Sequence, residues 1–190
     1  MARKTTGWLI RHDAIDEADR ELYEYAAYNL MFTSIPLTIF IVVCLCMGYV
    51  MNGLVLLVVT LSIRRYAGGY HAKTPQLCVV ISSGMLTACL FLSIVMPDHW
   101  PTCGAVLASA VCLCIFSPVD SENRRLDEEE TQSCRHKARC MTCFWCLIYL
   151  VLSVIGQGKL AVCVSLGIVV PAIMQMVCIG RFSKKHNKNE

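Results

Sequence analysis

The fold is decided by the first long apolar stretch of the chain, residues 30–63, which reads LMFTSIPLTIFIVVCLCMGYVMNGLVLLVVTLSI. It holds 34 uncharged residues. A single helix of that length would be about 51 Å long at ~1.5 Å per residue, whereas roughly 20 apolar residues cross the hydrocarbon core of a bilayer. Gly48, Asn52 and Gly53 lie near its middle and favour a turn there. We therefore predict that this stretch folds back as a hairpin of two membrane spans.

Four further uncharged runs follow, and each has the length of one span. They cover residues 74–97, 100–119, 140–158 and 160–180. The chain of 190 residues is 56% hydrophobic and 16% charged, against about 25% charged residues in a typical soluble domain. This balance excludes an ordinary soluble globule, and a net charge of only +3 does not indicate a nucleic-acid partner. We predict an all-α polytopic membrane bundle of six transmembrane helices.

The distribution of basic residues predicts the orientation of the bundle. If both termini and the even-numbered loops face the cytoplasm, 16 of the 17 Lys and Arg residues lie on that side and only Lys159 lies outside. The positive-inside rule requires such an asymmetry. We divide the chain into a cytoplasmic or interfacial segment (1–29), one membrane domain (30–180) that contains a long cytoplasmic loop (117–139), and a basic cytoplasmic tail (181–190).

The polar N-terminal segment carries one helical pattern. Ile15, Ala18, Leu22 and Ala26 recur at helical spacing, behind acidic residues that suit a helix N-terminus. We predict a short amphipathic helix that lies on the inner leaflet or packs under the bundle.

The chain contains 13 cysteines, most of them within the apolar spans. A buried free cysteine behaves as a small hydrophobic residue, and the odd count with cytoplasmic polar loops argues against a disulfide framework. One group has spacing that superficially suggests a metal site: Cys134, His136, Cys140, Cys143 and Cys146. Because its last three members continue into the fifth span on one helical face, we predict a packing role and no metal.

The loop between the second and third spans, residues 64–78, reads RRYAGGYHAKTPQLC and carries the candidate site. Thr74 followed by Pro75 is a typical helix start, which places Cys78 in the first turn of the next helix. The positive end of that helix and the neighbouring Lys73 favour a thiolate.

His71 lies seven residues before Cys78, too far for proton transfer along one continuous helix. Pro75 prevents such a helix, and Gly68 and Gly69 permit a sharp turn, so His71 can fold back over the helix start.

A cysteine paired with a histidine is the arrangement of a thiol nucleophile, in which the imidazole takes the thiol proton and the thiolate attacks a carbonyl carbon. On spacing alone, an interfacial histidine and a packing cysteine are the favoured interpretation, because a single His and a single Cys are a weak signal. Several residues are candidates for a third group that orients the histidine: Gln76, Asp120, Glu122 and Asn123.

Two ordered motifs resemble those of the accessory gene regulator B (AgrB) family. The first is Arg64-x-x-x-Gly68-Gly69-x-His71-Ala72 with Cys78 six residues later, and the second is SPVDSENRRL at residues 117–126. The resemblance covers nearly the whole chain. Arg124 and Arg125 stand where many relatives carry lysines, which keeps the charge but changes the contact geometry. We interpret these two arginines as substrate or packing contacts, or as an ordinary inner-leaflet anchor.

The resemblance implies a cysteine endopeptidase of bacterial quorum sensing, embedded in the cell membrane with its site on the cytoplasmic side. Such an enzyme removes the C-terminal tail of a small AgrD-like propeptide through an acyl-enzyme thioester and promotes thiolactone or lactone closure. His71 and Cys78 match the two catalytic positions. The resemblance also implies a homodimer and no cofactor.

Two other classes of membrane protein are alternatives to a peptidase. A small non-catalytic transporter or exporter is expected to carry ionisable residues within its spans, and these spans contain none. A membrane thiol–disulfide oxidoreductase needs a cysteine pair near the outer face, where Cys103 stands without a close partner in the sequence.

Overall fold

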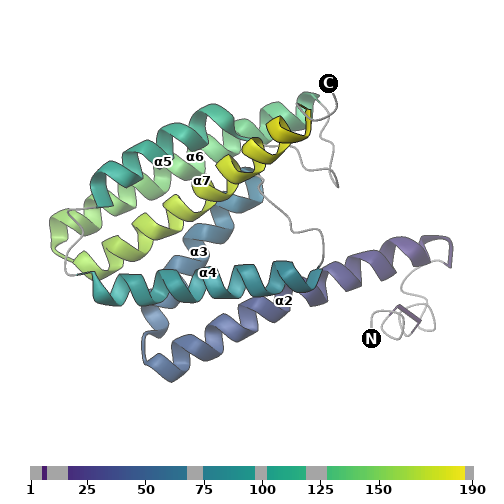
Figure 1. Ribbon diagram of the computed structural model, residues 1–190, viewed down its shortest axis with the longest axis horizontal. Helices are drawn as coiled ribbons and strands as arrows, with labels where there is room; N and C mark the ends of the chain where they lie inside the picture. Colours follow the sequence, from purple (N-terminus) through teal and green to yellow (C-terminus); the bar gives the residue numbers. More distant parts are fainter. Residues whose placement is uncertain (1–5, 8–16, 68–74, 97–101, 119–127, 187–190) are drawn as a thin grey trace.

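The computed structural model describes residues 6–7, 17–67, 75–96, 102–118 and 128–186. A short 3-10 helix, η1 (Glu17–Asp19), precedes the long helices of this part of the chain. The long helices are α2 (Arg20–Met47), α3 (Val50–Ala67), α4 (Pro75–Val95), α5 (Thr102–Phe116), α6 (Glu128–Ile155) and α7 (Gly158–His186) (Figure 1).

The predicted class, a polytopic helical membrane bundle, is confirmed. Among the described helices, α2, α3, α4, α6 and α7 are long and apolar enough to cross a membrane. The remaining predicted span is α5, which has 15 residues and is therefore about 22 Å long, against a hydrocarbon core of roughly 30 Å. The six predicted spans thus correspond to five helices of full length and one short apolar helix.

The predicted hairpin within residues 30–63 is present, and its turn lies at Gly48. Gly48 adopts φ 74°, and its N–H donates to the Leu45 carbonyl at 3.2 Å. Glycine takes this left-handed conformation without steric cost, so α2 ends here. Asn52 and Gly53, predicted as part of the turn, instead lie inside α3. A Cβ at Gly53 would collide with the Cys44 Sγ, so the absence of a side chain here allows α2 and α3 to pack closely.

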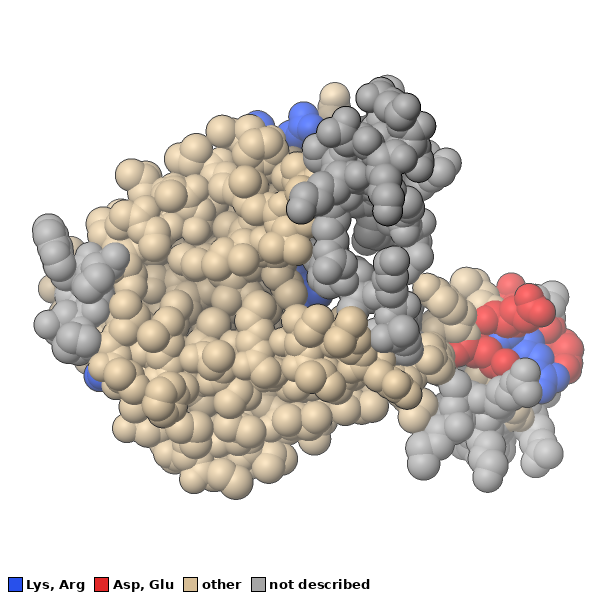
Figure 2. All heavy atoms as spheres, in the orientation of Figure 1, with Lys and Arg blue, Asp and Glu red and all other residues tan. Residues whose placement is uncertain are grey.

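The predicted amphipathic helix is not separate from the first span. Leu22 and Ala26 are helical, as predicted, but they belong to the first turns of α2, which continues without a break to Met47. No proline or glycine between residues 20 and 35 interrupts the helix. Figure 1 shows this part of α2 projecting beyond the other helices, and Figure 2 shows acidic and basic side chains gathered on it.

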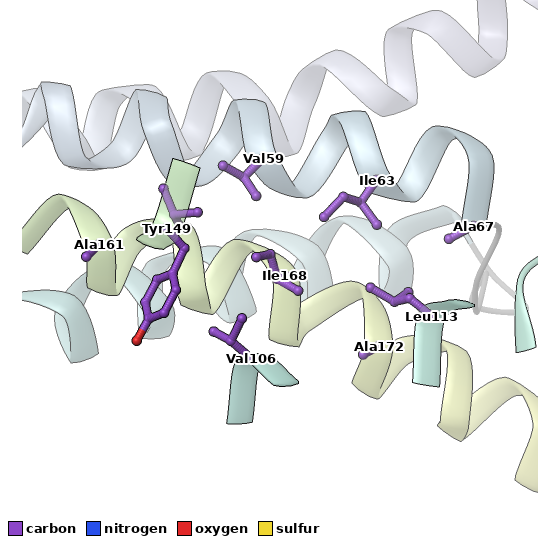
Figure 3. Packing of buried hydrophobic residues seen from close by; sticks show 10 residues of the cluster. Val59, Ile63, Ala67, Val106, Leu113, Tyr149, Ala161, Ile168 and Ala172 are labelled. Carbon is purple, nitrogen blue, oxygen red and sulfur yellow. The ribbon is translucent and has the colours of Figure 1, made fainter. Parts of the chain in front are cut away.

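Helix α7 lies at the centre of the bundle and packs against α3, α5 and α6. Figure 3 shows buried apolar side chains of these helices meeting, among them Ile63 of α3, Leu113 of α5 and Ile168 of α7. A Cβ at Gly167 would collide with the Val59 side chain, so α3 and α7 approach closely. Helix α4 also contacts α7 and, with α2, forms a second layer.

The two ends of the bundle differ in charge, as the charge count predicts. At one end, Lys159 Nζ donates to the carbonyls of Ile94 and Met96 at 2.7 and 2.8 Å, where α4 ends and α7 begins. The described basic side chains of α3 and α6 lie at the end of the bundle away from Lys159, near the last residues of α3 and the first turns of α6: Arg64, Arg65, Arg135, Lys137 and Arg139. Figure 2 shows a surface largely free of charge between the two ends. Which end faces the cytoplasm stays a prediction.

Candidate functional site

The candidate nucleophile lies where α4 begins. Helix α4 starts at Pro75, so Cys78 is its fourth residue and lies in its first turn, as predicted. Proline suits the first helical position because the N–H that it lacks would have no partner within the helix. The remaining first-turn N–H groups also lack intrahelical partners and point outward from the helix end. The Cys78 side chain is half-buried beside them.

The packing of α3 beside α4 brings a cation to this thiol. Arg64 lies one turn before the end of α3 and is half-buried. Its guanidinium is within electrostatic range of the Cys78 side chain. A positive charge beside a cysteine is the environment typical of reactive thiols. From the sequence, Arg64 is predicted only as a position of the first motif with a substrate-binding or structural role, because its distance from Cys78 depends on how two helices pack.

The next arginine along α3 has a different environment. Arg65 is exposed, and its guanidinium carbon lies 5.8 Å from the centre of the Tyr66 ring, an attractive cation–π contact. Consecutive helical residues point about 100° apart, so one arginine can interact with Cys78 while the other lies on the surface. Arg65 is therefore a matched comparison for Arg64.

Most other residues of the predicted site lie outside the described residues. This group contains His71, Gly68, Gly69, Lys73, Asp120, Glu122, Asn123, Arg124 and Arg125. Of the remainder, the structure places Arg64 within electrostatic range of Cys78 and Gln76 as an exposed residue at the start of α4. The pairing of His71 with Cys78 and the choice of a third group stay predictions.

The beginning of the second motif is fixed by two other helices. Ser117 is buried, its carbonyl accepts from Arg135 Nε of α6 at 3.2 Å, and its Oγ accepts from Gln175 Nε2 of α7 at 3.2 Å. Gln175 is fully buried, and its Oε1 has no hydrogen-bond partner within the part of the chain that the structure describes. Gln175 is not among the predicted site residues, although it is the one amide within the apolar run 160–180 and could have been noticed on that ground.

All thirteen cysteines are free. In the group with metal-like spacing, Cys140 is exposed. The predicted packing role fits the other two of the consecutive three: Cys146 packs against the core around α7, and Cys143, although partly exposed, hydrogen-bonds with the Cys114 side chain of α5. In the described ranges, no three His, Cys, Asp or Glu side chains are placed to hold a metal ion.

Comparisons with known proteins agree with the motifs. The family model described as Accessory gene regulator B matches residues 2–179. This range includes both motifs and the two helices that carry Arg64 and Cys78. Neither the comparison with curated proteins nor that with solved structures gives a match. The chain therefore belongs to the accessory gene regulator B family and has a role in the accessory gene regulator system of quorum sensing.

Proposed function

We propose that this protein is a membrane-embedded cysteine endopeptidase that removes the C-terminal tail of a small AgrD-like propeptide, with Cys78 as its nucleophile. Membership of the family implies a small propeptide substrate in the system. The observation that carries the proposal is the position of Cys78 in the first turn of α4, within electrostatic range of the Arg64 guanidinium. The family match favours this function over a transporter or an oxidoreductase.

The surroundings of Cys78 suit nucleophilic attack on a peptide carbonyl. The thiolate is the reactive form of cysteine, and a positive charge or a helix N-terminus beside it stabilises negative charge. When the sulfur attacks, that charge moves to the carbonyl oxygen. The first-turn N–H groups of α4 and the guanidinium of Arg64 are candidates to stabilise it, because donors fixed before the reaction lower the barrier most.

The proposed reaction has two halves. In the first, His71 takes the Cys78 proton, the sulfur bonds to the scissile carbonyl carbon, and the carbon–nitrogen bond breaks. The imidazolium then protonates the leaving amine, so the tail departs and a thioester remains on Cys78. In the second half, an internal Cys or Ser of the propeptide attacks the thioester carbonyl and closes a thiolactone or lactone. Its proton returns through His71 to the Cys78 sulfur.

Ring closure has to compete with hydrolysis of the thioester. Exchange of a thioester for a thiolactone changes the free energy little, because one bond of the same kind replaces another. Departure of the tail therefore drives the sequence forward, and a site that excludes water favours cyclisation. The half-buried position of Cys78 beside a long apolar helix supports such shelter.

The remaining parts of the proposal concern residues near the reacting pair and the assembly. Gly68 and Gly69 provide the turn that returns His71 to Cys78, and one residue among Gln76, Asp120, Glu122 and Asn123 orients the imidazole. Lys73, Arg124 and Arg125 contact the propeptide. The protein acts in the bacterial cell membrane, as a homodimer with its site on the cytoplasmic side, and it uses no cofactor.

Cleavage of a propeptide by the purified protein in lipid vesicles tests the function. The propeptide is an AgrD-like candidate chosen from the short reading frames near the gene of this chain, and the released tail is measured by mass spectrometry. We expect Cys78→Ala and His71→Ala to abolish release of the tail, while Cys78→Ala still binds the propeptide. Cys89→Ala, a change on the same helix away from its first turn, serves as the control. Release of the tail by Cys78→Ala would overturn the proposed mechanism.

A further inference from the structure

Two arginines of α6 reach across to the end of α5. Arg135 Nε donates to the Ser117 carbonyl at 3.2 Å, and Arg139 Nε donates to the Cys114 carbonyl at 3.0 Å. The last carbonyls of a helix have no partner within it, so these bonds satisfy acceptors that α5 leaves open. Residues four apart lie on the same face of a helix, which places the two guanidinium groups side by side.

The Nε bonds leave most of each guanidinium available. The group has five N–H donors in a fixed plane, so a bond at Nε orients the rest of the fork without using it. Arg135 and Arg139 are both exposed, and four residues of helix separate their origins by about 6 Å along the axis. Two such forks match the oxygens of one phosphate group, which arginine binds through paired hydrogen bonds.

The surroundings of this pair are apolar and exposed. Ile115 and Phe116 of α5, which directly follow the Cys114 carbonyl, have exposed fractions of 61% and 44%, and Leu147, about two turns beyond Arg139 on α6, has 61%. In a multi-pass membrane protein such side chains face lipid. Arg139 bonds to the carbonyl of Cys114, the residue before the exposed Ile115, so the guanidinium pair is at the boundary between polar and apolar surface. Figure 2 shows this contrast, with basic atoms at the end of the bundle and an uncharged surface beyond them.

We propose that Arg135 and Arg139 bind the phosphate of an anionic phospholipid whose acyl chains lie on the exposed apolar residues of α5 and α6. Basic groups between helices near the membrane surface are suited to anionic headgroups. Since Arg135 also holds Ser117, the bound lipid fixes the end of α5 against α6. This inference does not depend on the peptidase activity.

Thermal unfolding of the full-length protein in a neutral detergent tests the lipid site. The probes are phosphatidylglycerol, which is anionic, and phosphatidylcholine, which has no net charge. We expect phosphatidylglycerol to raise the Tm more than phosphatidylcholine does, and we expect Arg135→Gln with Arg139→Gln to remove at least half of that difference. Lys137→Gln is the matched control for Arg139→Gln alone, because residue 137 points about 200° away from residue 139 on the helix.

The difference between the two lipids separates binding from a purely structural role. If the arginines only cap α5, the double variant loses the same Tm in both lipids and keeps the difference, which overturns the proposal. An equal loss in Lys137→Gln, or the same stabilisation by inorganic phosphate without lipid, also overturns it. If the double variant cannot be purified, Arg139→Gln is judged against Lys137→Gln by the same criteria.

Discussion

At the scale of single residues, Arg64 has two properties that could act on Cys78, its charge and its planar set of donors, and substitution can separate them. Lysine retains the positive charge of arginine but not its planar fork of donors, whereas glutamine loses the charge. If Arg64 acts on Cys78 or on the developing oxyanion, both the charge and its direction matter. The neighbouring Arg65, which stacks on Tyr66, provides the comparison at almost the same place in the chain.

We predict that Arg64→Gln lowers kcat for propeptide cleavage by about 10²-fold or more, the usual effect of losing one group that stabilises a transition state. Arg64→Lys is expected to fall between this variant and the wild type, and Arg65→Gln to stay close to the wild type. Single-turnover cleavage in vesicles measures the effect without product release. A rate for Arg64→Gln equal to that of Arg65→Gln would contradict a role at Cys78.

A second prediction concerns the buried amide of Gln175. A buried polar atom without a partner costs about 1–3 kcal/mol, and replacing both partners of a buried hydrogen bond by apolar groups is often neutral. We therefore expect Gln175→Leu combined with Ser117→Ala to unfold at the wild-type temperature or above it in detergent. Gln175→Ala alone should unfold earlier, because it leaves a cavity. Equal losses in the two variants would contradict this account of the site.

Two of these residues also differ in whether their structure is predictable from the sequence. The position of Cys78 in a first turn follows from the local pair Thr74 and Pro75, and the structure confirms it. The hydrogen bond between Gln175 and Ser117 joins residues 58 apart in the sequence. Such a contact depends on which helices become neighbours, and no local pattern encodes that choice.

At the scale of helices, the pair α2 and α3 shows that glycine has two distinct uses. Gly48 and Gly53 lie close together in the sequence, and both were predicted as turn residues. Gly48 makes the turn because its φ is positive, whereas Gly53 is helical and lies against Cys44. Small residues let helix backbones approach closely in membranes. Sequence alone does not distinguish these two roles.

We predict that Gly53→Ala destabilises the protein by about 1–3 kcal/mol, because the added methyl overlaps the Cys44 side chain and forces the helices apart. The double variant Gly53→Ala with Cys44→Ala should recover part of this loss. Gly84→Ala is the control, since its Cβ would meet nothing within 4 Å in the middle of α4 and alanine favours the helix. Thermal unfolding in detergent measures all three, and equal effects of the two single changes would contradict the packing argument.

At the scale of the whole molecule, the number of apolar helices and the separation of charge were predictable, but the arrangement of the helices was not. All the apolar runs resemble one another in composition, yet α7 occupies the centre. Its contact surface contains small residues, among them Ala161, Gly167 and Ala172, which allow neighbours on several sides. The short α5 lies against α6 and α7, so its packing against these neighbours offsets a length below that of a full span.

The distribution of charge over the whole molecule predicts the orientation of the bundle in the membrane. Moving a cluster of arginines and lysines across a membrane is costly, so the end with Arg64, Arg135 and Arg139 should remain in the cytoplasm and the end with Lys159 should be outside. A green fluorescent protein fused after Glu190 should fluoresce, because it folds only in the cytoplasm. Alkaline phosphatase, which is active only outside it, should be active when fused after Gln157 and inactive after Glu190. Active phosphatase at the C-terminus would reverse the topology and place Cys78 on the side opposite to the one proposed, where a propeptide made in the cytoplasm does not reach it.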